Sequence, residues 1–142
     1  MQETIARLLA VLHRKNRCYV NRSLKPYKIT SSEVGILLSL YEKEGRTQEE
    51  LSSYLVIDKA AITRGLKSLE HKGYIIRVVD DIDRRYNRIH LTEDALAVKD
   101  EILFITRSWS NNIEEIVGKE EFKHLYETLQ TIKNTLLEEK NL

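Results

Sequence analysis

Two short helices joined by a tight connection are predicted by residues 47–73, TQEELSSYLVIDKAAITRGLKSLEHKG. Thr47 and Glu50 have the spacing of a capping box, in which a hydroxyl and a carboxylate satisfy free backbone N–H groups at a helix start. Asp58 suits the N-cap of the second helix, and Gly73 suits the left-handed residue that ends it. The segment therefore predicts helix, connection and helix over residues 47–72.

The second of these helices has two different faces. Ile62, Leu66 and Leu69 recur at steps of four and three, so we expect them to face a core. The opposite face is small and cationic, with Lys59, Ala60, Thr63, Arg64 and Lys67. A helix-turn-helix places its second helix in the major groove of DNA, where long cations reach phosphates or guanine edges. An ordinary surface helix with solvated charges is the alternative for this helix taken alone.

A β-hairpin is predicted directly after the second helix. Residues 74–79, YIIRVV, are rich in β-branched and aromatic side chains, and residues 88–91 alternate polar and apolar. The tip between them carries Asp83, Arg84 and Arg85 and is too charged to pack inward. Winged helices use such a tip to insert Arg into a neighbouring minor groove, and Asp83 is placed to orient Arg85 by a charge-assisted hydrogen bond.

The flanking segments are predicted to be helical. Residues 3–22 form one apolar-periodic helix that Pro26 ends, and Thr30–Glu33 is a capping box for a helix that Gly45 ends. From Thr92 the apolar spacing predicts a helix that runs to Gly118, and a second apolar stripe follows it with Phe122, Leu125, Leu129, Ile132 and Leu136. The expected fold class is mainly α with a small β-hairpin wing.

The terminal helices carry more apolar surface than is needed to cover the small middle domain. A two-fold homodimer is the economical use of that surface, and a monomer that folds these helices onto itself is the alternative. We therefore expect an N-terminal dimerisation helix over residues 1–29, a winged helix-turn-helix DNA-binding domain over residues 30–92 and C-terminal dimerisation helices over residues 93–142.

Composition limits the classes of protein that need consideration. Of 142 residues, 42% are apolar and one is Cys, so a core is expected, and a disulfide framework or multi-cysteine zinc site is excluded. There is no apolar run of about 18 to 20 residues, so no membrane partner and a cytoplasmic location are expected. No nucleotide loop, nucleophile elbow, paired catalytic carboxylates or metal-ligand spacing occurs, so we expect neither an enzyme nor a cofactor.

Charge is distributed unevenly along the chain. Residues 1–92 hold 17 Lys and Arg against 11 Asp and Glu, whereas residues 93–142 hold 6 against 11. The first part therefore has the charge to face a polyanion such as duplex DNA.

These motifs together resemble the MarR family of bacterial transcription regulators. The resemblance rests on TQEEL from Thr47, ITR from Ile62, LEHKG from Leu69, DRR at 83–85 and IHLT from Ile89. It implies a homodimer with two winged helices on a pseudo-palindromic duplex, acting as a repressor that a small-molecule effector releases.

By position, the resemblance also implies roles for single residues. It implies that Thr63, Arg64 and Lys67 lie on the reading helix, that Arg85 enters the minor groove and that Asp83 braces it. Val56 departs from the family pattern, where Gly is frequent, and bulky Tyr86 departs from it after the DRR tip.

Two further interpretations stay open. The helical bundle with its winged helix is also compatible with a protein-interaction module that binds a protein partner rather than DNA. Cys18 has Arg14, Lys15 and Arg17 nearby, which favour thiolate chemistry, but a lone helical cysteine is more often a small buried apolar residue.

Overall fold

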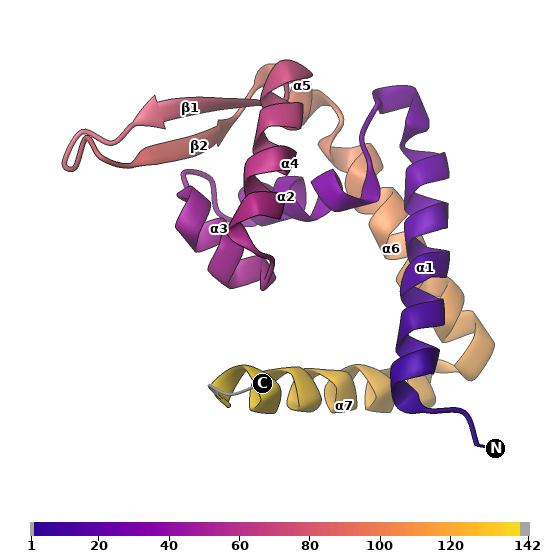
Figure 1. The fold of residues 1–142 in the computed structure, drawn as a ribbon. Coiled ribbons are helices and arrows are strands. Elements are labelled where there is room, and N and C mark those ends of the chain that lie inside the picture. Colours follow the sequence, from indigo (N-terminus) through magenta and orange to yellow (C-terminus); the bar gives the residue numbers. More distant parts are fainter. Residues whose placement is uncertain (1, 140–142) are drawn as a thin grey trace. The chain divides into compact units, whose positions relative to one another are not determined.

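The computed structural model describes residues 2–139, which form helices and one two-stranded antiparallel sheet (Figure 1). The helices are α1 (Ile5–Ser23), the short 3-10 helix η1 (Lys25–Tyr27), α2 (Ser31–Glu42), α3 (Gln48–Leu55), α4 (Lys59–His71), α5 (Glu93–Ala97), α6 (Lys99–Val117) and α7 (Lys119–Glu138). The strands are β1 (Ile75–Val79) and β2 (Asn87–Leu91). The chain forms two compact units, of which the first ends at Ile105 and the second begins at Thr106. The predicted fold class is confirmed.

A single apolar core holds the first unit together. It draws buried side chains from α1 and its C-cap residue, α2, α3, α4, both strands and α6, including Leu24, Leu37, Leu40, Leu51, Ile62, Leu66, Leu69, Ile75, Ile89 and Ile102. The predicted inward stripe of α4 (Ile62, Leu66 and Leu69) is therefore buried. Because α4 is anchored by this stripe, its opposite face stays at the surface.

The helix starts form at the predicted residues. The Thr47 hydroxyl accepts a hydrogen bond from the Glu50 backbone N–H at 3.2 Å, and the Asp58 carboxylate accepts one from the Ala61 N–H at 2.8 Å. Gly73 has a left-handed φ of +83° directly after the C-cap of α4. Local capping thus sets the start of α3 and both ends of α4.

The hairpin continues directly from α4 and extends away from it (Figure 1). In its register Ile75 pairs with Leu91, Arg77 with Ile89, and Val79 with Asn87. On its other edge β2 is hydrogen bonded to the α2–α3 connection: the Gly45 N–H donates to Ile89 O at 3.0 Å, and the Ile89 N–H donates to Arg46 O at 2.9 Å. The base of the wing is therefore fixed to the segment that precedes α3.

Two predicted helix ends differ from the structure. The prediction of one helix running from Thr92 to Gly118 is wrong, because α5 ends at Ala97 and α6 begins at Lys99. At this break the Ala95 carbonyl, which would accept from residue 99 in a continuous helix, accepts from the Tyr41 hydroxyl at 2.6 Å. Helix α2 ends at Glu42, and Gly45 (φ +82°) lies two residues beyond its C-cap rather than ending it.

The terminal helices carry exposed apolar side chains. On α1 these are Ile5, Leu8, Leu9 and Leu12, and on α7 they are Leu125, Tyr126, Leu129, Ile132, Leu136 and Leu137. Cys18 on α1 is also exposed, so the expectation of a buried small apolar residue is wrong at this position.

Candidate nucleic-acid interface

The outward face of α4 presents cations to solvent. Lys59, Arg64 and Lys67 are all exposed, and the Lys59 side chain is 74% exposed. The Lys59 Nζ lies 3.7 Å from a Glu49 carboxylate oxygen, a contact between two exposed groups that contributes little to stability. These three side chains are therefore available to a polyanion that approaches α4.

Thr63 lies on the same helix but its hydroxyl already has partners. The Thr63 Oγ1 donates to the Lys59 carbonyl at 2.8 Å and accepts a hydrogen bond from the Gln48 side-chain amide. Thr63 therefore connects α4 to the first turn of α3. Gln48 was not predicted as a site residue, since no local pattern indicates that a side chain 15 positions away would meet Thr63.

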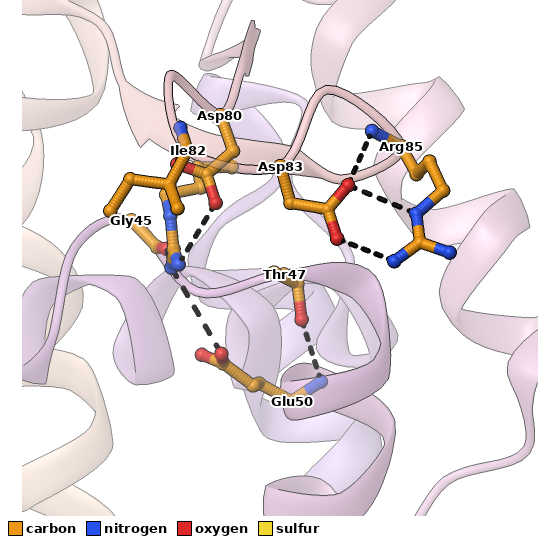
Figure 2. A network of polar contacts seen from close by, with 8 residues as sticks. Gly45, Thr47, Glu50, Asp80, Ile82, Asp83 and Arg85 are labelled. Atoms are coloured by element: carbon orange, nitrogen blue, oxygen red, sulfur yellow. Dashed lines mark hydrogen bonds and ion pairs between the residues drawn. The ribbon is translucent and has the colours of Figure 1, made fainter.

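The wing tip holds an ion pair between Asp83 and Arg85 (Figure 2). The Arg85 Nε and Nη2 donate to the two carboxylate oxygens of Asp83 at 3.0 and 2.8 Å, and the Arg85 backbone N–H donates to the same carboxylate at 3.1 Å. Hydrogen bonding from Arg85 holds the pKa of Asp83 below its ordinary value and raises the pKa of Arg85. Arg84 is exposed beside this pair.

A polar hollow lies between the wing and the helix-turn-helix. Its lining includes Gln48, Lys59, Arg77, Arg85 and Asn87, so α3, α4, β1, β2 and the wing tip all contribute to it. Arg77, which sequence reasoning did not assign as a site residue, has its Nε 3.3 Å from a Glu70 carboxylate oxygen. Three cations from three different elements, together with the acidic Glu49, thus line one depression.

Both departures from the family pattern have a structural reading. Val56, the C-cap of α3, has a φ of +56° in the left-handed region, and its side chain is 63% exposed. A β-branched residue is strained there, whereas glycine is not, so the turn keeps a glycine-like conformation. Tyr86 is 42% exposed, with its ring centroid 6.0 Å from the Arg85 guanidinium carbon, the outer limit of a cation–π contact.

A buried carboxylate fixes α4 against α2. Glu33 is 3% exposed and accepts hydrogen bonds from Lys72 Nζ at 2.8 and 2.9 Å, from the Ser68 hydroxyl at 2.9 Å and from the Thr30 N–H at 3.0 Å. Burial raises the pKa of Glu33, but these hydrogen bonds together outweigh it and lower the pKa below its ordinary value. The predicted Thr30–Glu33 capping box therefore also anchors α4.

Within residues 2–139 there is no group of three or more His, Cys, Asp or Glu side chains that could hold a metal ion. None of the helices in that range is both long and apolar enough to cross a membrane.

Known proteins with the same organisation were identified by sequence and by structure. The model of the MarR family matches residues 29–86. The HTH-type transcriptional regulator BilQ of Clostridioides difficile (strain CD3) is 27% identical over 132 residues, which cover 93% of this chain and 89% of BilQ. A MarR transcriptional regulator from Methanosarcina mazei Go1 superposes with a TM-score of 0.90 at 28% identity, covering 96% of this chain and 99% of that one.

The fold is also similar to that of a protein solved on DNA. The transcriptional repressor CouR, bound to a 23-mer DNA duplex, superposes with a TM-score of 0.82 at 22% identity, and the match covers 92% of each chain.

Proposed function

We propose that this protein, a DNA-binding transcription regulator of the MarR family, acts as a homodimeric repressor of pseudo-palindromic promoter sites in the cytoplasm and is released from them by a small-molecule effector. The observation that carries the proposal is the arrangement of exposed cations on α4 and at the wing tip, on either side of one polar hollow.

The arrangement fits the two grooves of a duplex. With α4 in the major groove and the wing in the adjoining minor groove, the DNA sugar-phosphate backbone that separates the two grooves passes between α4 and the wing. The hollow lies at this position, and its cations Lys59, Arg77 and Arg85 are suited to a phosphate backbone, although Glu49 also lines it and each cation has a carboxylate partner in the protein. Arg64 and Lys67 then face base edges or phosphates of the major groove, and Arg84 lies beside the inserted Arg85.

Similarity to CouR supports this docking. CouR has the same fold and is bound to a 23-mer duplex. We infer that α4 and the wing of this chain face DNA, with the direct contacts made by Lys59, Arg64, Lys67, Arg84 and Arg85. Thr63 and Asp83 act indirectly, by holding other residues in place: Thr63 is hydrogen bonded to Gln48, and Asp83 orients Arg85.

The homodimer is supported by unpartnered apolar side chains on the terminal helices. Leu125, Leu129, Ile132 and Leu136 recur at steps of four, three and four along α7, and each is between 39% and 49% exposed. A stripe at this spacing suits packing against another helix, and a two-fold axis would bury the stripes of both copies. Two reading helices related by this axis would meet half-sites about 34 to 36 Å apart, one duplex turn.

The proposal is tested by titrating the protein with duplexes over a series of salt concentrations. Contacts to phosphate release counterions, so the logarithm of the association constant should fall linearly with the logarithm of salt concentration. Weak, salt-insensitive association, or none, would contradict DNA binding as the activity of this fold.

A protein-interaction module is the second candidate, and one observation favours it. The hairpin exposes Ile76, Val78, Val79 and Ile82, and the Ile82 side chain at the tip is 96% exposed. Adjacent exposed apolar side chains are typical of contacts with another protein, and Ile76 and Val78 lie on the same face of β1. Binding of a protein partner through the wing, with no salt-dependent binding of duplex DNA, would favour this reading.

A further inference from the structure

Arg88 on β2 joins the wing to the helix-turn-helix by contacts on three segments. Its Nη1 donates to the Gly45 carbonyl at 2.9 Å and lies 4.0 Å from a Glu50 carboxylate oxygen. Its Nη2 lies 3.5 Å from Asp80 Oδ2, at the point where β1 gives way to the wing tip. The labelled Gly45, Glu50 and Asp80 lie near one another in Figure 2, and each of them contacts the Arg88 guanidinium.

Asp80 connects Arg88 to the wing tip by hydrogen bonds with Ile82 and Tyr86. Its side chain is only 14% exposed, and its other carboxylate oxygen accepts a hydrogen bond from the Ile82 N–H at 3.4 Å. The Asp80 N–H donates to Tyr86 O at 2.9 Å across the tip. A continuous set of contacts therefore runs from α3 and Gly45, through Arg88 and Asp80, to the loop that carries Asp83 and Arg85.

We propose that Arg88 is a positioning residue that sets the placement of the wing tip relative to the reading helix, and thereby the insertion of Arg85 into the minor groove. The DNA-contact part of this inference rests on the proposed function, whereas the clamp itself does not. The Arg88 side chain is 41% exposed, and its guanidinium already contacts the Gly45 carbonyl and the Asp80 carboxylate. We therefore expect Arg88 to act through these contacts rather than by binding a phosphate.

Hydrogen exchange of the protein without DNA tests the clamp. The backbone amides of residues 80 and 89 report on the clamp, because they donate to Tyr86 O and Arg46 O. Both amides should exchange about tenfold faster in Arg88→Met and in Asp80→Asn, which is the size of effect expected for residues coupled in one network. Amides of α4 should keep their protection, which excludes general unfolding. Lys43→Met, which removes an exposed cation outside the wing, is the matched control. Unchanged exchange in both wing variants would overturn the clamp.

Binding to DNA then separates positioning from charge. Asp80→Asn removes a negative charge from a surface that faces a polyanion, so electrostatics alone would tighten binding. Positioning gives the opposite sign: Asp80→Asn and Arg88→Met should both weaken binding to duplexes with A·T-rich flanks, by about tenfold if the coupling is of ordinary size. Tighter binding by Asp80→Asn would overturn the role in DNA binding.

A double variant distinguishes positioning from a direct phosphate contact. If Arg88 acts through Arg85, then Arg88→Met should cost little affinity in an Arg85→Ala background. If instead the two losses add and the salt slope falls by about one, Arg88 contacts phosphate itself and the inference is wrong. If the wild-type protein binds no duplex, the proposed function fails while the exchange experiment still decides the clamp.

Discussion

The Asp83 carboxylate and the Arg85 guanidinium form a two-point ion pair at the wing tip, with contacts of 3.0 Å from Nε and 2.8 Å from Nη2. Both residues belong to an exposed loop, where a single long side chain would otherwise sample many rotamers. The pair restricts Arg85 before any ligand arrives, so the proposed insertion of Arg85 into a groove would lose less conformational entropy. Figure 2 shows the remaining guanidinium nitrogen outside both contacts.

Arg85→Ala should weaken binding most on duplexes with A·T-rich flanks. A·T-rich minor grooves are narrow and concentrate negative potential, which attracts an inserted Arg. We expect a loss of about tenfold on such flanks and a smaller loss on G·C-rich flanks, the size of one specific contact. Fluorescence anisotropy with matched duplexes that differ only in the flanks measures both. A loss that is equal on every flank would contradict minor-groove insertion.

Arg64→Ala should cost about 1 to 3 kcal/mol of binding free energy if Arg64 reads a base. The preference at one position of each half-site should then relax, because the wrong bases are no longer penalised there. A competition series with single-base changes across the half-site measures this. Uniform weakening on all sequences would instead assign Arg64 a phosphate contact.

Val56→Gly should stabilise the fold. Val56 is held at φ +56°, where a side chain with a branched β-carbon costs about 1 to 2 kcal/mol, and its exposure means that little apolar burial is lost. The greater entropy of glycine in the unfolded chain offsets part of this gain, so we expect a net increase of about 0.5 to 1 kcal/mol. Urea unfolding measures it, with Val56→Ala as the control that stays strained. A destabilised glycine variant would show that the left-handed turn carries no strain.

Glu33→Gln should destabilise the protein by about 1 to 3 kcal/mol at neutral pH, because the partly buried Lys72 ammonium would be left without its carboxylate partner. The Lys72 ammonium would lose both of its contacts to a carboxylate. Because the folded pKa of Glu33 lies below its ordinary value of 4.5, its contribution is present above that pH and is lost as pH falls through the folded pKa.

The acid dependence supplies the check on that prediction. Unfolding free energies measured from pH 7 downward should fall less steeply in Glu33→Gln than in the wild type below pH 4.5. Parallel curves for the two proteins would mean that protonation of Glu33 is not coupled to folding.

Leu129→Glu should convert a dimer to monomers. The substitution places a charge in the centre of the apolar stripe of α7, where burial against a second copy would be unfavourable. Light scattering after size exclusion measures the mass, and Asn134→Glu, on the opposite side of α7, is the matched control. A wild-type protein that is monomeric, or a Leu129→Glu variant that stays dimeric, would contradict the use of this stripe.

Local sequence signals were sufficient for most helix bounds. Thr47, Asp58 and Gly73 act on backbone groups within a few residues, so their spacing alone predicts where α3 and α4 begin and where α4 ends. The hairpin could also be predicted from local sequence, because two β-rich segments flank a charged tip within a short stretch of chain.

Contacts between residues far apart in the sequence could not be predicted in this way. The break between α5 and α6 coincides with the Tyr41 hydroxyl, 54 residues away from Ala95. The contact of Arg88 with Gly45 spans 43 residues, and that of Lys72 with Glu33 spans 39. No local periodicity encodes which charged side chains meet across such distances, so these residues became recognisable only in the folded chain.

Sequence-specific binding of DNA by a dimer is tested most directly by selecting bound duplexes from a random DNA pool, with an Arg64→Ala, Arg85→Ala double variant run in parallel. The wild-type protein should enrich an inverted repeat with half-sites about 34 to 36 Å apart, and the double variant should not. A pool that stays unenriched with the wild-type protein at both low and moderate salt would contradict sequence-specific binding.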